Sequence, residues 1–290
     1  MKSKKAPARR KNMGNMLLCA PLIAWIGALI VIPLAYLLYM SFQTKGPMGT
    51  VVYKFTLENY AKIFEAEYFT VLKKSVWIAL ISTFACVALG YPLAFFIASK
   101  RSQASGILML MLMVPFWTCV LVTIYSFVIL FAREGLLNSL LLWLGITKEP
   151  MDLLYNDFSV SVGMVYMLLP FAAMPMYASI EKLDQSLIEA SKDLGAGRIR
   201  TFVKVVLPLT RPGIFAAVIL TFIPCIGYYM ITDMLGGGTT MLIGNIIYNQ
   251  FTSARNWPFG AALSCLLAAA ILIMMFAYTK TGGDLDDLGG

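Results

Sequence analysis

The chain has 290 residues, of which 59% are hydrophobic and only 13% are charged, and its formal net charge is +8 at pH 7. A soluble domain carries about 25% charged residues, so this composition excludes an ordinary water-exposed protein. The sequence contains no histidine, which excludes catalysis by a Ser-His-Asp or Cys-His arrangement. We therefore expect an all-α, polytopic integral membrane protein.

Six apolar segments are long enough to cross a bilayer, which takes about 20 residues as a helix. They cover residues 16–42, 71–97, 106–131, 158–180, 213–232 and 259–279. No two-residue alternation recurs at the spacing of barrel strands, so a transmembrane β-barrel is not expected. The chain thus divides into a basic N-terminal segment (1–15), a six-helix domain (16–280) with a polar loop (181–212), and a short acidic tail (281–290).

The basic residues are distributed unequally between the two sides of this arrangement. Fifteen of the 23 Lys and Arg residues lie in the N-terminal segment, the 99–105 turn, the 181–212 loop and at Lys280. The positive-inside rule therefore places both termini and this loop in the cytoplasm. The first span follows a basic stretch, as a signal peptide does. It is longer than the about 7–15 apolar residues of such a peptide, so we expect it to be retained.

The residue types needed for chemistry are largely absent. The five cysteines lie inside predicted spans without a CxxC pair, so we expect small buried hydrophobes rather than metal ligands or disulfides: Cys19, Cys86, Cys119, Cys225 and Cys265. The glycine-rich 236–240 stretch lacks the lysine of a phosphate-binding loop and is expected to be a connector. The predicted spans contain no Asp or Glu, which disfavours intramembrane hydrolysis and proton-driven transport. We expect no catalytic residue, no metal site and no cofactor in this chain, with energy supplied by a separate subunit.

We expect two short amphipathic helices in the polar 181–212 loop. Ser186 and Glu189 fit the S-x-x-E capping box that begins a helix. Four small or apolar residues then recur with helical spacing on one face: Leu187, Ala190, Ser191 and Leu194. Gly195 and Gly197 are expected to end this helix and turn the chain.

A second helix should follow, with one apolar face formed by Phe202, Val205, Val206 and Leu209. Two short helices joined by a glycine bend suit docking into a groove of a soluble partner. The alternative is a pair of interfacial helices lying on anionic lipid. For Glu189 alone, the capping role explains the residue with or without a partner.

The loop also resembles a known motif. Permease subunits of binding-protein-dependent ABC importers carry the pattern E-A-A-x-x-x-G-x9-I-x-L-P. This chain has matching residues at the same spacing, namely Glu189, Ala190, Ser191, Gly195, Val205, Leu207 and Pro208. Ser191 and Val205 depart from the pattern by small changes of volume. Further blocks are similar to the first permease subunit of spermidine/putrescine importers: residues 90–96, 114–118, 168–171, 179–184, 242–245 and 257–260.

This resemblance implies a type I importer permease with several partners. Two permease subunits would form a pore, two cytoplasmic ATPases would hold ATP and Mg²⁺, and an extracytoplasmic polyamine-binding protein would deliver the substrate. The residues expected at the ATPase contact are Glu189, Ala190, Ser191, Asp193, Gly195, Arg198, Leu207 and Pro208. The charged loop between apolar spans is then the place where energy enters.

A polyamine path needs aromatic faces, carbonyls or carboxylates, because cation–π contacts contribute about 0.5–2 kcal/mol each. Candidates within or at the ends of the spans are Phe116, Trp117, Tyr125, Tyr166, Tyr228, Tyr229 and Asp233. Packing in the core or at the lipid interface is the alternative for each aromatic residue. For the whole chain the alternatives are a permease for another small solute, a self-contained channel or carrier, and a membrane scaffold.

Overall fold

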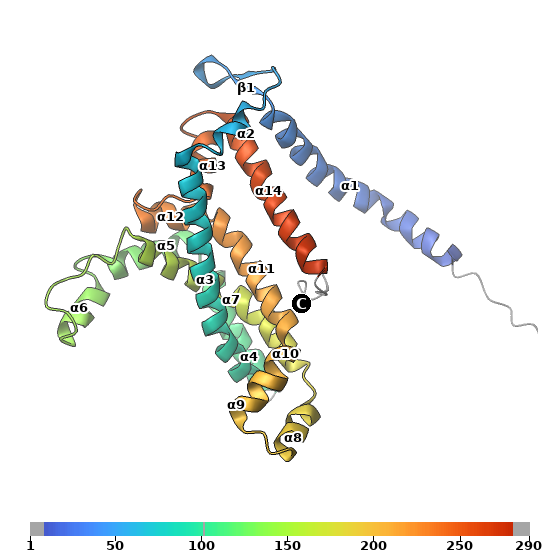
Figure 1. The fold of residues 1–290 in the computed structure, drawn as a ribbon, viewed down its shortest axis with the longest axis vertical. Coiled ribbons are helices and arrows are strands. Elements are labelled where there is room, and N and C mark those ends of the chain that lie inside the picture. Colours follow the sequence, from blue (N-terminus) through green and yellow to red (C-terminus); the bar gives the residue numbers. More distant parts are fainter. Residues whose placement is uncertain (1–8, 101, 281–290) are drawn as a thin grey trace, which may run out of the picture.

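The computed structural model describes residues 9–100 and 102–280 (Figure 1). Residues 1–8 of the predicted basic segment and the whole predicted acidic tail lie outside the described residues. Within the described part, five helices are long and apolar enough to cross a membrane. A sixth span is formed if the bent pair Arg198–Leu209 and Arg211–Gly227, which turns by 65°, is counted as one. The all-helical membrane fold expected from the sequence is therefore confirmed.

Three long helices form the centre of the molecule: α3 (Ala66–Ala98), α7 (Asp157–Glu181) and α11 (Arg211–Gly227). Each contacts the other two, as Figure 1 shows. Small side chains such as Ala79, Ala172 and Ala217 are fully buried there. Small residues let helix backbones approach closely, and in lipid such packing drives helix association in place of the hydrophobic effect.

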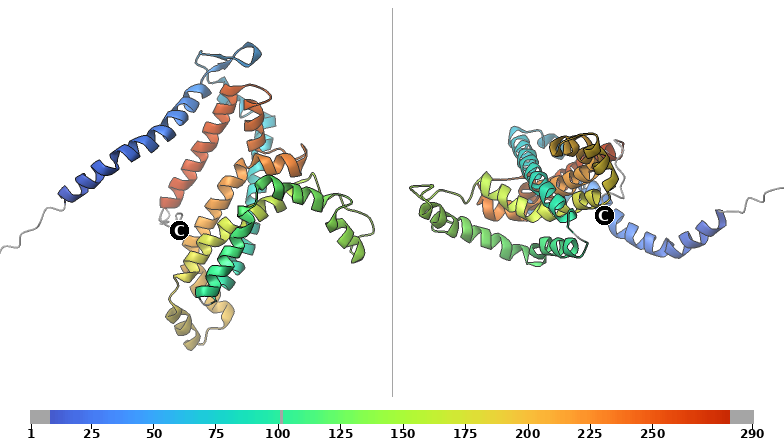
Figure 2. Two further views of the ribbon diagram at one scale, coloured as in Figure 1. Left: turned by 180° about the vertical axis from the view of Figure 1, so that it is seen from behind. Right: turned by 90° about the horizontal axis from the view of Figure 1, so that it is seen from below.

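The first helix, α1 (Arg9–Ser41), extends away from this centre and contacts α14 (Trp257–Lys280) (Figures 1 and 2). Most of its membrane-length part, Ala20–Ser41, is not buried against the described chain, and only the end at Met40 and Ser41 is covered. Trp25 and Ile32, for example, are each 66% exposed. Lipid or another chain must therefore cover this helix in the membrane.

The third predicted span is wrong as a single helix over 106–131. The structure divides it into α4 (Ser102–Met113), the 3-10 turn η2 (Val114–Trp117) and α5 (Val120–Phe131). Proline has no backbone N–H to continue the hydrogen bonding of an α-helix, and the interruption falls at the proline at 115. Beyond α5, the short α6 (Leu136–Trp143) projects sideways from the body (Figure 1).

The two ends of the molecule carry different elements (Figure 1). One end holds the antiparallel pair β1 (Thr44–Lys45) and β2 (Val51–Val52), in which Thr44 faces Val52. Between and beyond these strands lie η1 (Pro47–Gly49) and α2 (Glu58–Lys62). The opposite end holds α8 (Gln185–Asp193), α9 (Arg198–Thr201), the π-helical turn η3 (Phe202–Val206) and α10 (Leu207–Leu209). We call residues 185–209 the docking segment.

The fifth predicted span, 213–232, also departs from a single helix. After α11 the chain breaks and continues as α12 (Tyr229–Gly236), which is followed by α13 (Ile243–Phe251). We call residues 224–248 the broken-helix region. It lies towards the end of the molecule opposite to the docking segment (Figure 1).

Candidate functional site

The docking segment begins with a cap that differs from the predicted one. Asp184, not Ser186, is the N-cap of α8, and its carboxylate accepts a hydrogen bond from the Ser186 backbone N–H at 2.9 Å. That hydrogen bond lowers the pKa of Asp184. A charged aspartate caps a helix as well as serine does and is also favoured by the helix dipole, so it takes this position. The predicted capping box is therefore wrong, and the exposed Glu189 carboxylate is not engaged in capping.

The predicted end of α8 is confirmed. Gly195 has a φ of +78°, in the left-handed region that favours glycine. Its N–H donates to the carbonyl of Lys192 at 2.8 Å, and the N–H of Ala196 donates to the carbonyl of Ser191 at 3.1 Å. This pair of bonds is the Schellman motif, which satisfies the free carbonyls at a helix end. The turn thus fixes the direction in which α9 leaves.

The predicted apolar face of α8 forms one wall of a surface groove of about 600 Å³. The residues that line the groove are Leu187, Ala190, Ser191, Leu194, Ala196, Arg200, Lys204, Val205, Pro208 and Leu209. Leu194 is 89% exposed, so most of its side chain is not covered by the part of the chain that the structure describes. An apolar groove beside Arg200 and Lys204 suits a partner with apolar and acidic side chains.

The predicted face of the second helix is only partly correct. Val206 is 3% exposed and Phe202 packs against the core, whereas Leu209 is 46% exposed. The reason is the π-helical turn η3, which contains more residues per turn than an α-helix. The turn rotates the following residues away from the position that regular α-helical spacing predicts.

The eight residues expected at the ATPase contact are not all placed alike. Exposed on the loop are Glu189, Ala190, Asp193, Gly195 and Arg198. Ser191 and Pro208 are half-buried and line the groove. Leu207 instead packs against the hydrophobic core. Five of the eight are therefore exposed, and two more line the groove without being fully buried.

The buried side-chain amide of Asn245 stabilises the break between α11 and α12. Tyr228 has a ψ of 81°, outside the helical region, and Pro224 lies one turn earlier. The Asn245 side chain donates to the Tyr229 carbonyl at 3.2 Å, and its oxygen accepts bonds from the Thr232 hydroxyl and the Leu242 N–H. Asn245 is 6% exposed. It thus satisfies backbone groups that the break would otherwise leave unpaired in the membrane.

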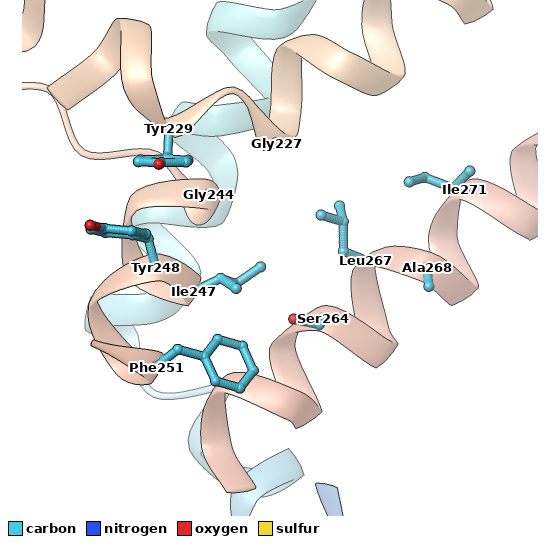
Figure 3. A pocket seen from close by; sticks show the side chains of 10 residues that line it. All are labelled: Gly227, Tyr229, Gly244, Ile247, Tyr248, Phe251, Ser264, Leu267, Ala268 and Ile271. Carbon is cyan, nitrogen blue, oxygen red and sulfur yellow. The ribbon is translucent and has the colours of Figure 1, made fainter. Parts of the chain in front are cut away.

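Two tyrosines stack next to this break (Figure 3). The rings of Tyr229 and Tyr248 are 4.4 Å apart at their centroids and 10° from parallel. They line an apolar groove of about 460 Å³ that also includes Phe251 and Ser264. Tyr229 was among the predicted pathway residues. Tyr248 was not among them. It lies three residues after Asn245, which ends the 242–245 block, and this position could have indicated it as a pathway residue.

Two further grooves lie beside α5. Tyr228 and Tyr229 line one of about 490 Å³ together with Val120 and Pro224. Tyr166 lines the other, of about 370 Å³, and its ring meets that of Phe127 edge-on at 5.1 Å. The structure therefore brings Tyr228 and Tyr229 into one site and places Tyr166 against α5.

Of the remaining predicted pathway residues, only Asp233 lies in the broken-helix region. Phe116 packs edge-on against Phe171 at 4.8 Å. Trp117 and Tyr125 are 75% and 54% exposed, and Asp233 is exposed on α12. Among these, only Asp233 shares an element with Tyr229, four residues before it.

The cysteines were predicted to be buried hydrophobes. Cys86 and Cys225 are fully buried, Cys265 is half-buried, and Cys119 is exposed at the start of α5, where the prediction is wrong. The side chain of Cys19 lies outside the described part of the structure. Among the residues that the structure describes, no group of three His, Cys, Asp or Glu side chains is arranged to hold a metal ion.

Residues 90–280 match the family described as "Binding-protein-dependent transport system inner membrane component". The chain belongs to this family. It is a multi-pass inner membrane protein and a permease subunit of an ABC importer, so it is a transport subunit and not an enzyme. The matched range contains both the docking segment and the broken-helix region.

Curated relatives align over nearly the whole chain. The spermidine/putrescine transport system permease protein PotB of Escherichia coli is 41% identical over 259 residues, which is 89% of this chain and 94% of PotB. PotB of Haemophilus influenzae is 36% identical and covers 93% of this chain and 94% of its own length. The inner membrane ABC transporter permease protein YdcU of Escherichia coli is 30% identical over 94% of this chain and 90% of YdcU.

Solved structures share the fold at low sequence identity. A bacterial ABC transporter that imports the acidic polysaccharide alginate superposes with a TM-score of 0.74 at 17% identity, covering 93% of this chain and 96% of that chain. The MetNI methionine ABC transporter in an inward-facing conformation gives a TM-score of 0.55 at 16% identity, over 75% and 97% of the two chains. These likenesses support the type I permease fold.

Proposed function

We propose that this chain forms half of the translocation pore of an ATP-driven importer of polyamines, spermidine or putrescine. The observation that carries the proposal is the 41% identity to the PotB permease over 89% of the chain. A likeness of this extent includes the docking segment, the broken helix and the apolar spans together. The alginate and methionine transporters, at 17% and 16% identity, support the fold and not the cargo.

Energy would enter this permease through the docking segment. The predicted spans contain no carboxylate that could carry a coupling proton. The groove of about 600 Å³ beside α8 instead offers a partner an apolar cleft edged by Arg200 and Lys204. A cytoplasmic ATPase dimer that holds ATP and Mg²⁺ would bind there, with Glu189 and Gly195 in its contact.

The other partners and the orientation follow from the same proposal. A second permease subunit would complete the pore, and an extracytoplasmic polyamine-binding protein would deliver cargo at the opposite end, where β1 and β2 lie (Figure 1). Both termini would be cytoplasmic, because the 181–212 loop and the N-terminal segment each carry many of the 23 basic residues.

The broken-helix region offers what a flexible cation needs. Tyr228, Tyr229 and Tyr248 present aromatic faces, and Asp233 is exposed four residues after Tyr229. Each cation–π contact contributes about 0.5–2 kcal/mol, enough to guide a polycation without trapping it.

The experiment is reconstitution of this chain in lipid nanodiscs with its partner permease, ATPase and binding protein. Spermidine or putrescine should stimulate ATP hydrolysis, while a neutral amino acid and an alginate oligosaccharide should not. Stimulation by another small solute alone would contradict the polyamine assignment and keep the importer. A solute flux without any bound ATPase would indicate a self-contained channel or carrier.

A further inference from the structure

One aromatic side chain of the docking segment packs against the central helix α3. Phe202, the first residue of the π-helical turn, meets Tyr91 edge-on with ring centroids 5.7 Å apart and Phe95 with centroids 6.4 Å apart. Tyr91 is 8% exposed, and Phe202 packs against the buried core. The turn is therefore inserted between two aromatic residues of α3. Single π-helical turns of this kind occur frequently at functional positions in helices.

A hydrogen-bonded chain joins the same place to α11. The hydroxyls of Tyr91 and Thr210 are 2.8 Å apart, and the Thr210 hydroxyl donates to the Val206 carbonyl at 3.0 Å. Each hydroxyl has one proton to donate and can accept as well, so either of the two can be the donor in this pair. Thr210 is fully buried and stands between α10 and α11, where the chain bends by 65°. The bend is thus tied to α3 by a side-chain bond.

The helices around this bend are packed closely at two glycines. A Cβ atom at Gly213 would lie 2.5 Å from the Cβ of Ser179 and 2.6 Å from the carbonyl oxygen of Pro175. A Cβ atom at Gly90 would lie 2.9 Å from the terminal methyl of Met176. Both glycines therefore bring their helices directly against α7. Close-packed interiors have low compressibility and transmit displacement.

The other end of the path reaches the groove. The hydroxyls of Ser191 in α8 and Thr201 in α9 are 3.0 Å apart, and Thr201 is 5% exposed. Thr201 immediately precedes Phe202. A continuous set of contacts therefore leads from the groove-lining face of α8 to α3 and α11.

We propose that Tyr91, Phe202 and Thr210 form a joint that transmits movement of the docking segment into rotation of α11 and thus to the broken-helix region. Tyr91 and Thr210 are positioning residues for energy coupling, because they act through the helices that they join. The inference rests on the proposed function in one respect, that an ATPase moves the docking segment. It gives a role to the 90–96 block, which the resemblance alone left without one.

The test measures amide hydrogen exchange in the reconstituted complex with and without a non-hydrolysable ATP analogue. In the unmodified complex, the analogue should change exchange in residues 185–209 and also in α12. In Tyr91→Phe and Thr210→Val, the change in 185–209 should remain. The change in α12 should fall about fivefold, the factor that corresponds to the ~1 kcal/mol of one buried hydrogen bond. Thr210→Ser keeps the hydroxyl and should behave as the unmodified complex.

The matched control is Tyr177→Phe. Tyr177 makes a hydroxyl bond of the same 2.8 Å length to Ser105, between α7 and α4. This control should leave the α12 response intact. The proposal is wrong if the response reaches α12 undiminished in both joint variants, if Tyr177→Phe reduces it equally, or if Tyr91→Phe releases the ATPase. No cargo is present in this experiment, so its failure is distinct from a failure of the polyamine assignment.

Discussion

The docking segment and the broken-helix region satisfy their free backbone hydrogen-bonding groups in different ways. The docking segment satisfies its helix ends locally, through Asp184 at the start of α8 and the Gly195 turn at its end. The broken-helix region leaves backbone groups open within the apolar part of the chain, and Asn245 of α13 satisfies one of them, the Tyr229 carbonyl, from another helix. A local solution tolerates movement as a unit, whereas a solution built between helices fixes them in register.

This difference suits the two roles. A segment that an ATPase pulls on must keep its shape while it moves, and local caps provide this. A site that cargo passes must keep a non-helical backbone in lipid, which is tolerated only where protein or a water-filled cavity covers it. Substitutions that separate the two kinds of stabilisation should therefore give different results in assembly, stability and transport.

The largest effect should come from Asn245→Leu. Three hydrogen bonds to the Asn245 side chain are lost and the buried Leu242 N–H loses its acceptor, so we expect destabilisation by ~3 kcal/mol. Thermal unfolding of the purified complex measures it. Asn249→Ala, an exposed amide on the same helix, is the control and should change little. Equal melting temperatures for the two variants would show that Asn245 does not hold the break.

The next effect should come from Glu189→Arg in the docking segment. Glu189 is exposed and does not cap α8, so reversal of its charge should leave the permease folded. A charge-assisted contact with the ATPase would be lost, which weakens binding by ~1.5–3 kcal/mol. ATPase co-purification measures this, with Glu189→Gln expected in between. Undiminished co-purification in Glu189→Arg would exclude Glu189 from the contact.

A smaller effect should follow from Gly195→Val. A residue with a Cβ in the left-handed region costs roughly 1–2 kcal/mol, and Gly195 has a φ of +78°. Gly197 has a φ of −67° and open space around its Cβ position, so Gly197→Ala is the matched control. ATP-dependent uptake should fall in Gly195→Val and stay unchanged in Gly197→Ala. A fall in uptake in Gly197→Ala but not in Gly195→Val would show that transport does not depend on the left-handed turn at Gly195.

Tyr248 allows the cargo path to be tested separately from assembly. Tyr248→Leu removes the ring that stacks on Tyr229 at 4.4 Å, while Tyr248→Phe keeps it. We expect the Leu variant to raise the KM for polyamine uptake several-fold, in line with about 0.5–2 kcal/mol per cation–π contact. The Phe variant should match the unmodified chain. A KM unchanged in both would remove Tyr248 from the path.

The sequence predicted these two regions unequally well, for a physical reason. Gly195 and the groove-lining face of α8 depend on neighbours close in the chain, so spacing alone indicated them. The π-helical turn at 202–206 packs against Tyr91 of the distant α3, and the break at Tyr228 is stabilised by Asn245 of α13, so regular spacing placed Leu209 and the fifth span incorrectly. At the start of α8, the sequence pattern predicted Ser186 as the N-cap, whereas the structure has Asp184 there. Both side chains can accept a hydrogen bond from the first free N–H groups of the helix, and the pattern does not decide between them.

The smallest effect should be the pH dependence of the α8 cap. The Ser186 backbone N–H lowers the pKa of Asp184 below its ordinary value of 3.8. Stabilisation from a lowered pKa is present above the ordinary value and is lost as the pH falls through the folded one. Amide exchange at residues 185–188 should therefore be unaffected between about pH 7 and pH 5 beyond its intrinsic rate, and α8 should fray below about pH 4.

Asp184→Ala should remove this cap at every pH, with α8 frayed even at neutral pH. The amides around Asn245 should show no such change, because no titrating side chain takes part in that network. Fraying of α8 in the unmodified chain already at pH 5 would assign the cap to another group. A matching response around Asn245 would contradict the distinction itself, since it would show that the ends of the two regions depend on one another rather than on separate local and interhelical bonds.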